Sequence, residues 1–326
     1  EIASCLVGSE MCIRDSIMPL SPTAFPDPSS DVLAHDLTAV QQGPIGVFDS
    51  GVGGLSILQA LRTELPHEDF VYFADSGHAP YGEREDGFVV ARSLAIAHYL
   101  LATHAIKALV VACNTATAAA IQSLRLALPH LPIIGVEPAL KPAVAVSRTR
   151  RIGVVATRGT LGSAKFQRLL LSQQTLAEFV VQPCPGLALA LENAVAIDAG
   201  NTGQLAKNRL EISALIERHL SAMGAFGSAP GQIDTLVLGC THYPFAMREF
   251  QAQAGSGVQL LETGVPVARQ TRRLLQARTA LHLARAQAGH LTLFTTGSAT
   301  ALQLAAMRWL QIPSSVPATS LDLATA

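Results

Sequence analysis

Residues 45–58 read IGVFDSGVGGLSIL, a short apolar run that leads through a small polar turn into a helical stretch. Residues 152–166, IGVVATRGTLGSAKF, follow the same order later in the chain. Short strands that alternate with helices are typical of a parallel sheet. The first stretch therefore predicts the α/β class, and its echo suggests an internal duplication.

Apolar runs of strand length form two series of four. Helices are expected between them, notably over 88–104 and 117–127. A further run, LTLFTTG at 291–297, follows a helix expected over 265–278 and could add a strand to the first series. The expected strands are 45–49, 70–75, 108–113 and 132–137 in the first series, and 151–157, 179–184, 235–240 and 258–262 in the second.

The composition describes a globular chain with no strong charge. Its 326 residues are 49% hydrophobic, which is enough to fill real cores. The 23 basic and 24 acidic residues give a formal net charge of −1, so no electrostatic excess recruits nucleic acid or an anionic membrane. No apolar run reaches the roughly 18 residues of a bilayer-spanning helix. We therefore expect a small ligand.

The first 43 residues differ from the rest of the chain. Residues 1–16 resemble a translated sequencing adapter, and we expect the authentic start at Met18 or just after it. Residues 19–43 are rich in Pro, Ser and Asp, which predicts a mobile tail. Beyond this region three scattered cysteines remain, a number that suits a reducing cytoplasm.

A cysteine ends the third strand of each series. Cys113 stands in VVACNT and Cys240 in LVLGCTH, and polar residues that could cap a helix follow each. Open α/β sheets bind ligands at this edge, where a helix N-terminus can lower a thiol pKa or hold a carboxylate. A buried cysteine is more often packing, but two matching contexts favour chemistry. Cys184, in QPCPG, lacks such neighbours and is interpreted as structural.

A dinucleotide site is the competing interpretation of the first turn. Gly51-x-Gly53, with Asp75 downstream as a ribose-binding acid, matches part of the fingerprint for such sites. Ser56 stands at the third glycine position, however, and Asp49 would set a negative charge near the pyrophosphate. The alternative makes Asp49 and its neighbour Ser50 catalytic or substrate-holding groups.

We expect neither a metal nor an organic cofactor. Cys240-Thr-His242 lacks the further ligands that zinc requires. The chain has only four lysines, none of them in a recognisable motif for a pyridoxal cofactor. His242 could instead orient Cys240 or share its proton.

Six motifs occur in one order over about residues 44–310. They are IGVFDSGVGGLSIL, YFADSGHAPYGER, VVACNTATA, ATRGT, LVLGCTHYPF and FTTG. In these motifs and their order the chain resembles the aspartate/glutamate racemase superfamily. Ser76, Glu262 and Ser298 depart from residues that are frequent in the family, and all three lie outside the cysteine motifs.

The resemblance implies a cofactor-independent enzyme that interconverts L- and D-glutamate and supplies the D-isomer for peptidoglycan. Cys113 would deprotonate D-glutamate with help from Asp49, and Cys240 would deprotonate L-glutamate with help from His242. The residues implied to hold the substrate are Asp49, Ser50, Tyr81, Gly82, Asn114, Thr115, Thr241 and His242, with Thr157, Thr160 and Glu192 as further candidates.

The resemblance also implies two pseudo-symmetric parallel-sheet α/β domains with the active site in the cleft between them. Residues 44–139 and 268–326 would form the first domain and 140–267 the second. We expect a cytoplasmic homodimer, and a peptidoglycan precursor is considered as an activator. The alternatives are racemisation of aspartate or another amino acid, or a non-catalytic amino-acid-binding or gyrase-binding protein on the same scaffold.

Overall fold

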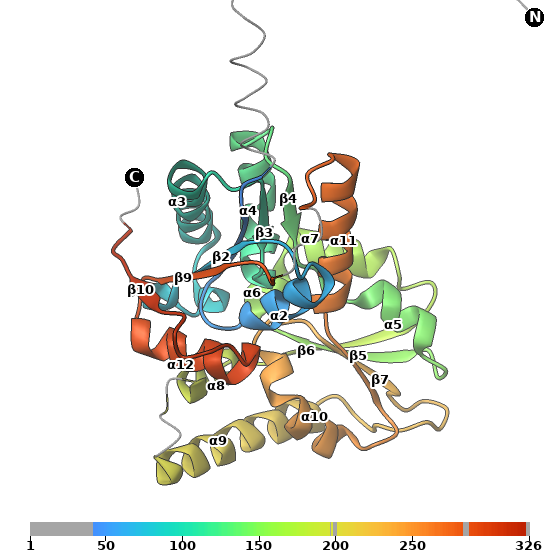
Figure 1. Ribbon diagram of the computed structural model, residues 1–326. Helices are drawn as coiled ribbons and strands as arrows, with labels where there is room; N and C mark the ends of the chain where they lie inside the picture. The colour runs from blue at the N-terminus through green and yellow to red at the C-terminus, as the bar shows by residue number, and fades with distance from the viewer. Residues whose placement is uncertain (1–41, 196, 198–200, 283–286, 324–326) are drawn as a thin grey trace, which may run out of the picture.

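Two separate parallel sheets organise the protein, as a computed structural model shows (Figure 1). The structure describes residues 42–195, 197, 201–282 and 287–323. The adapter-like segment and nearly all of the expected tail fall in residues 1–41, outside the described residues. The α/β class predicted from the alternation of strands and helices is confirmed.

The larger sheet has the strand order β10-β9-β2-β1-β3-β4, and every pair in it is parallel. Its central strands are buried along their whole length, as expected for a sheet covered on both faces. The strands are β1 (Ile45–Asp49), β2 (Phe70–Ala74), β3 (Ala108–Val111), β4 (Ile133–Gly135), β9 (Leu291–Thr295) and β10 (Ala318–Ser320).

The smaller sheet repeats the central part of the larger one. Its order is β6-β5-β7-β8, so in both sheets the first strand of the series lies between the second and the third, and the fourth lies outside. The predicted pseudo-symmetry is therefore present in the topology. These strands are β5 (Arg151–Ala156), β6 (Glu178–Pro183), β7 (Thr235–Leu238) and β8 (Gln259–Leu261).

Helices cover both faces of each sheet. On the larger sheet one face carries α2 (Leu55–Glu64), α11 (Gly264–Ala277) and α12 (Ala299–Leu310), and the other carries α3 (Asp86–His104) and α4 (Asn114–Ala127). On the smaller sheet one face carries α8 (Leu187–Val195), α9 (Thr202–Ser221) and α10 (Met247–Ala254), and the other carries α5 (Leu140–Val146), α6 (Arg158–Gly162) and α7 (Ala164–Leu171).

The expected elements differ from the observed ones mainly at their ends. The helix predicted over 117–127 begins three residues earlier, at Asn114, because the Cys113 side chain accepts a hydrogen bond from Ala116 N and caps it. Strand β10 was not predicted, because three edge residues show no readable period. None of the described helices is long and apolar enough to cross a membrane.

Helix α4 offers a matched test of the core. Leu124 is 0% exposed and Leu126 is 82% exposed. Leu124→Ala should lower the free energy of unfolding by about 2–5 kcal/mol, because it leaves a cavity beneath the sheet. Leu126→Ala should change it by less than about 0.5 kcal/mol. Urea denaturation checks both values, and equal effects of the two variants would contradict this packing.

Candidate active site

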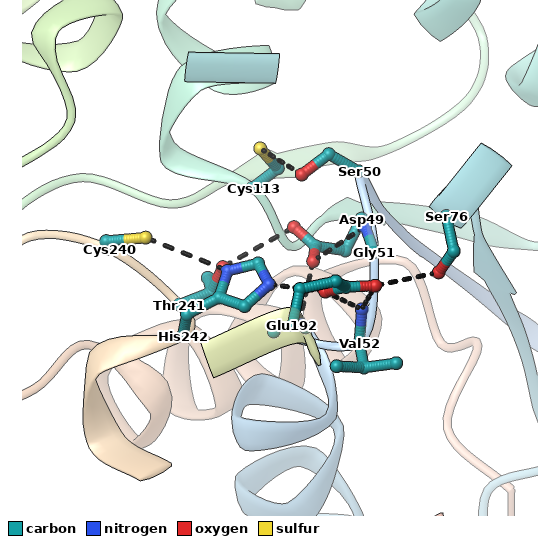
Figure 2. Close-up of polar contacts among 12 residues, drawn as sticks. Asp49, Ser50, Gly51, Val52, Ser76, Cys113, Glu192, Cys240, Thr241 and His242 are labelled. Atoms are coloured by element: carbon teal, nitrogen blue, oxygen red, sulfur yellow. Dashed lines mark hydrogen bonds and ion pairs between the residues drawn. The ribbon is translucent and has the colours of Figure 1, made fainter. Parts of the chain in front are cut away.

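The carboxyl ends of the two sheets meet, and side chains from both sides contact one another there (Figure 2). Thr241 Oγ1, after β7, donates to Asp49 Oδ1, at the end of β1, over 3.4 Å. Thr115 Oγ1, after β3, lies 3.0 Å from Thr157 Oγ1, after β5. The predicted site residues of both halves are thus brought together.

Cys113 lies between β3 and α4 and is 5% exposed. Its sulfur accepts a hydrogen bond from Ala116 N at 3.4 Å and donates one to Ser50 Oγ at 3.7 Å. Burial, followed by the Asp49 carboxylate, raises the pKa of this thiol well above its usual range, although Ala116 N–H and Ser50 act in the opposite direction. A helix N-terminus can lower a thiol pKa, but at Cys113 desolvation outweighs this effect, so the group is a neutral thiol here.

Cys240 occupies the equivalent position after β7 and is 6% exposed. Its surroundings differ from those of Cys113, because the short 3-10 helix η3 (Tyr243–Ala246), with a proline in its first turn, follows it. The sulfur lies 3.8 Å from His242 Nδ1. The second thiol is therefore paired with an imidazole and does not cap a helix.

Glu192 on α8 holds the other side of His242, with Oε2 2.6 Å from Nε2. The same carboxylate accepts hydrogen bonds from Val52 N at 2.9 and 3.1 Å and from Ser76 Oγ at 2.9 Å. Burial alone would raise the pKa of Glu192, but His242, Val52 N–H and Ser76 lower it below its usual range. Glu192 lies on a helix that covers the smaller sheet, and it therefore links that half to two loops of the larger sheet by hydrogen bonds.

His242 is 3% exposed, and its protonation depends on these neighbours. Burial would lower the pKa of His242, but Cys240 and Glu192 together raise it well above its usual range. The ring is therefore an imidazolium placed between the Glu192 carboxylate and the Cys240 sulfur. Its Nδ1–H can be donated to the sulfur, and only the neutral imidazole that remains could take a proton back.

Asp49 supports the loop after β1 and does not touch the thiol that it was expected to assist. Its Oδ2 accepts hydrogen bonds from Gly51 N at 3.2 Å and Gly54 N at 2.9 Å. Burial, reinforced by Glu192 and opposed by His242 and the two N–H groups, raises the pKa of Asp49 to about 6. Ser50 is the residue of this loop that contacts Cys113.

Tyr81 and Asp75 form a buried polar cluster beside the site. Tyr81 Oη donates to Asp75 Oδ2 at 2.5 Å, and Arg92 donates to both carboxylate oxygens, at 2.6 and 2.9 Å. These contacts lower the pKa of Asp75 below its usual range although burial alone would raise it. Asp75 is thus committed to Arg92 and Tyr81, which argues against its being the ribose-binding acid of a dinucleotide site.

Three threonine hydroxyls cluster where α4 and α6 approach. Thr115, Thr157 and Thr160 lie within 3.0–3.4 Å of one another. Gly82 packs against them so closely that a Cβ there would lie 2.8 Å from Thr157 Cβ. All four residues were predicted at the site, the two second-series threonines as further candidates.

Asn114 is the predicted residue whose polar atoms are free. It is 4% exposed, and neither amide atom has a hydrogen-bond partner in the described part of the chain. A buried amide without partners is costly unless a ligand satisfies it. Because Asn114 is the first residue of α4, its amide lies at the helix end that favours anions.

Two contacts of the site were not expected from the sequence. Ser56 Oγ donates to the Thr241 carbonyl at 2.8 Å, and Arg92 neutralises Asp75 as described above. Ser56 stands in the quoted IGVFDSGVGGLSIL motif, but a single sequence does not reveal which backbone its hydroxyl meets. Arg92 lies within the long helix α3, where nothing in the sequence marks it as a partner of Asp75.

Comparison with known proteins places the chain in a family. A family model described as Asp/Glu/hydantoin racemase matches residues 55–271. A glutamate racemase of Ectopseudomonas mendocina (strain ymp) is 47% identical over 247 residues, which cover 76% of this chain and 88% of the relative. The chain belongs to the Asp/Glu/hydantoin racemase family.

Solved structures agree with this assignment. The crystal structure of glutamate racemase isoform RacE1 from Bacillus anthracis superposes with a TM-score of 0.71 at 30% identity, covering 87% of this chain and 98% of that one. Escherichia coli glutamate racemase, solved in complex with L-glutamate and the activator UDP-MurNAc-Ala, gives a TM-score of 0.66 at 28% identity over 82% and 95% of the two chains.

The titration of Asp49 tests the electrostatics of the site without any turnover. In protein labelled with 13C at the aspartate carboxyls, one resonance should titrate near pH 6 and should vanish in Asp49→Asn. Since burial raises this pKa above its ordinary 3.8, the group should make the free energy of unfolding fall as pH rises from about 4 to about 6. If every aspartate titrated below pH 5, the account of the site would be wrong.

Proposed function

We propose that this chain is a glutamate racemase that interconverts L- and D-glutamate by proton transfer between two thiols, without a cofactor. The observation that carries the proposal is the pair Cys113 and Cys240, which end equivalent strands of two pseudo-symmetric sheets and lie among residues that contact one another. The sequence and structural relatives named glutamate racemase support the choice of substrate.

Inversion of a stereocentre needs removal of a proton from one face and delivery to the other. A single fixed base tends to return the proton to the face from which it came. Two thiols on opposed sheets solve this, provided that one starts as thiolate and the other as thiol. The neutral Cys113 and the Cys240–His242–Glu192 chain provide unlike surroundings of the kind that this requires.

In the L-to-D direction Cys240 takes the α-proton and Cys113 delivers its own proton to the opposite face. Cys240 must start this step as the thiolate, and the neighbouring His242 imidazolium stabilises it by holding its proton at Nδ1, while Glu192 keeps the ring oriented through Nε2. In the D-to-L direction the roles of the thiols exchange. Asp49 acts through the loop that it holds, because its carboxylate bonds Gly51 and Gly54 N–H groups.

The substrate groups would be held by the residues around the thiols. Asn114 is the strongest candidate for a carboxylate, since its amide is unpartnered at the N-terminus of α4. Ser50, Thr115 and Thr241 offer hydroxyls, and the Tyr81-Gly82 turn closes over the threonine cluster. The phenol of Tyr81 itself is engaged by Asp75, so Tyr81 serves through its backbone or its bulk.

The α-proton of an amino acid is much less acidic than a thiol, so the carbanion must be stabilised. A site of low dielectric strengthens each hydrogen bond to the developing charge. The two thiols are 5% and 6% exposed, which supports catalysis in a site that is closed to water. Each tenfold gain in rate requires about 1.4 kcal/mol from these sources.

The proposal extends to the organisation of the chain. Residues 44–139 and 268–326 would form one domain and 140–267 the other, because α11 packs in the core of the larger sheet. A cytoplasmic location suits three free buried thiols. A homodimer, a role in peptidoglycan synthesis and activation by a precursor such as UDP-MurNAc-Ala are proposed by analogy with the family and with the E. coli complex.

Substitution of the thiols tests the mechanism directly. Cys113→Ala and Cys240→Ala should each lower the racemisation rate of L-glutamate by at least about 10²- to 10⁴-fold, because each removes one acid–base group. Cys184→Ala is the matched control, since Cys184 is also buried but its sulfur donates to the Gln182 carbonyl at 3.7 Å and follows no strand equivalent to β3 or β7. Circular dichroism follows the loss of optical activity; wild-type turnover by either of the first two variants would refute the roles.

The choice of amino acid is tested with the same signal. L-glutamate should lose its optical rotation with the wild-type protein, whereas L-aspartate should react at least about tenfold more slowly, since one missing methylene misplaces the second carboxylate. A faster reaction with L-aspartate than with L-glutamate would show that aspartate is the preferred substrate. Binding of glutamate without racemisation would support the non-catalytic alternative.

A further inference from the structure

Ser56 is a polar residue of the first motif that the proposed chemistry leaves unused. It lies in the first turn of α2, just after the loop that carries Asp49 and Ser50. Its hydroxyl lies 2.9 Å from the Gly53 carbonyl of its own loop and 2.8 Å from the Thr241 carbonyl. The second contact joins a helix of the larger sheet to the cysteine motif of the smaller sheet.

The accepting carbonyl belongs to the peptide that joins Thr241 to His242. A hydrogen bond to this oxygen fixes the plane of the peptide and with it the Cα of His242, because a peptide has no free rotation. His242 in turn lies 3.8 Å from the Cys240 sulfur through Nδ1. The Ser56 hydroxyl therefore acts on the second thiol through the residue that exchanges protons with it.

The backbone at Gly53, in the loop before Ser56, also contacts the imidazole of His242. A Cβ added at Gly53 would lie 2.4 Å from His242 Nδ1, so the ring rests directly on this glycine. Glu192 holds the opposite nitrogen at 2.6 Å. His242 is thus fixed on one side by Gly53 and Ser56 of the larger sheet and on the other by Glu192 of the smaller one.

The first thiol is held differently, because its motif meets the other sheet through Thr115, whose hydroxyl contacts Thr157 and Thr160, and not through a hydrogen-bond partner of the sulfur. The hydrogen-bond partners of Cys113 are Ala116 N and Ser50 Oγ, and both belong to the larger sheet and its helices. Both hydrogen-bond partners of the Cys113 sulfur therefore come from one half of the molecule. The partner of the Cys240 sulfur, His242, instead rests on the loop of residues 53–56 from the other half.

From this asymmetry we infer that Ser56 is a positioning residue for the Cys240–His242 pair, which it holds from the other half of the molecule through the Thr241 carbonyl. The inference rests on the proposed racemisation of glutamate. It follows that loss of the Ser56 hydroxyl affects only one of the two proton transfers. The transfer at Cys240 is slowed, and the transfer at Cys113 is left intact.

Isotope effects separate the two steps. In Ser56→Ala the value of kcat/KM should fall about five- to tenfold in both directions, as expected for one lost hydrogen bond and as the fixed equilibrium between the enantiomers requires. The primary isotope effect on kcat/KM should rise with α-deuterated L-glutamate, because its deuteron is removed at Cys240. It should fall with α-deuterated D-glutamate, because removal at Cys113 then limits the rate less.

Thr63→Ala is the matched control. Thr63 lies on the same helix, and its exposed hydroxyl donates to the Gln59 carbonyl at 2.9 Å within the helix. This variant should leave rates and isotope effects unchanged. Isotope effects do not depend on the fraction of folded enzyme, so partial unfolding of Ser56→Ala could not produce the opposite shifts.

Two results would overturn the inference and are distinguishable from failure of the function. Unchanged isotope effects in Ser56→Ala, or a shift of the same sign with both enantiomers, would show that Ser56 does not act on the Cys240 step. Absence of racemisation by the wild-type protein in the same assay would instead refute the proposed function on which the inference rests.

Discussion

The contact of Glu192 with His242, Val52 and Ser76 is the interaction on which the site depends. In the described part of the chain, Glu192 is the residue of the smaller half that holds the His242 imidazolium against Cys240, and it also links the loops after β1 and β2 to α8. The carboxylate is buried, yet its partners keep its pKa low, so the link is ionic and carries two charges in a site of low dielectric. Removal of one partner would leave the other charge buried alone.

The two thiols are equivalent in the topology and unlike in their surroundings. Cys113 caps a helix in a site where burial keeps it neutral, and Cys240 stands beside an imidazolium. The repeated strand order of the two sheets supplies the symmetry that the two faces of one carbon require. Because their neighbouring residues differ, the two thiols can differ in protonation. Each turnover requires this difference, since one sulfur must take a proton while the other delivers one.

Much of this arrangement can be predicted from the sequence, for physical reasons. Most strands are rich in apolar residues and are followed by polar turns, so their positions and the two thiols that follow them can be predicted from pattern and motif. The contacts of Glu192 join residues up to 140 positions apart, and no local pattern encodes them. The pKa of Cys113 could not be predicted, because the helix N-terminus that can lower it is visible in the sequence, whereas the burial that outweighs this effect exists only in the fold.

The central claim is that protons leave and arrive on opposite faces through different sulfurs. The most direct measurement is deuterium incorporation when L-glutamate is converted in D2O at low conversion. The account predicts solvent deuterium at the α-carbon of the D-glutamate formed, and protium retained in the L-glutamate recovered. Protium carried into the D-product, or rapid deuteration of the recovered L-enantiomer, would mean that one group serves both faces and would contradict the account.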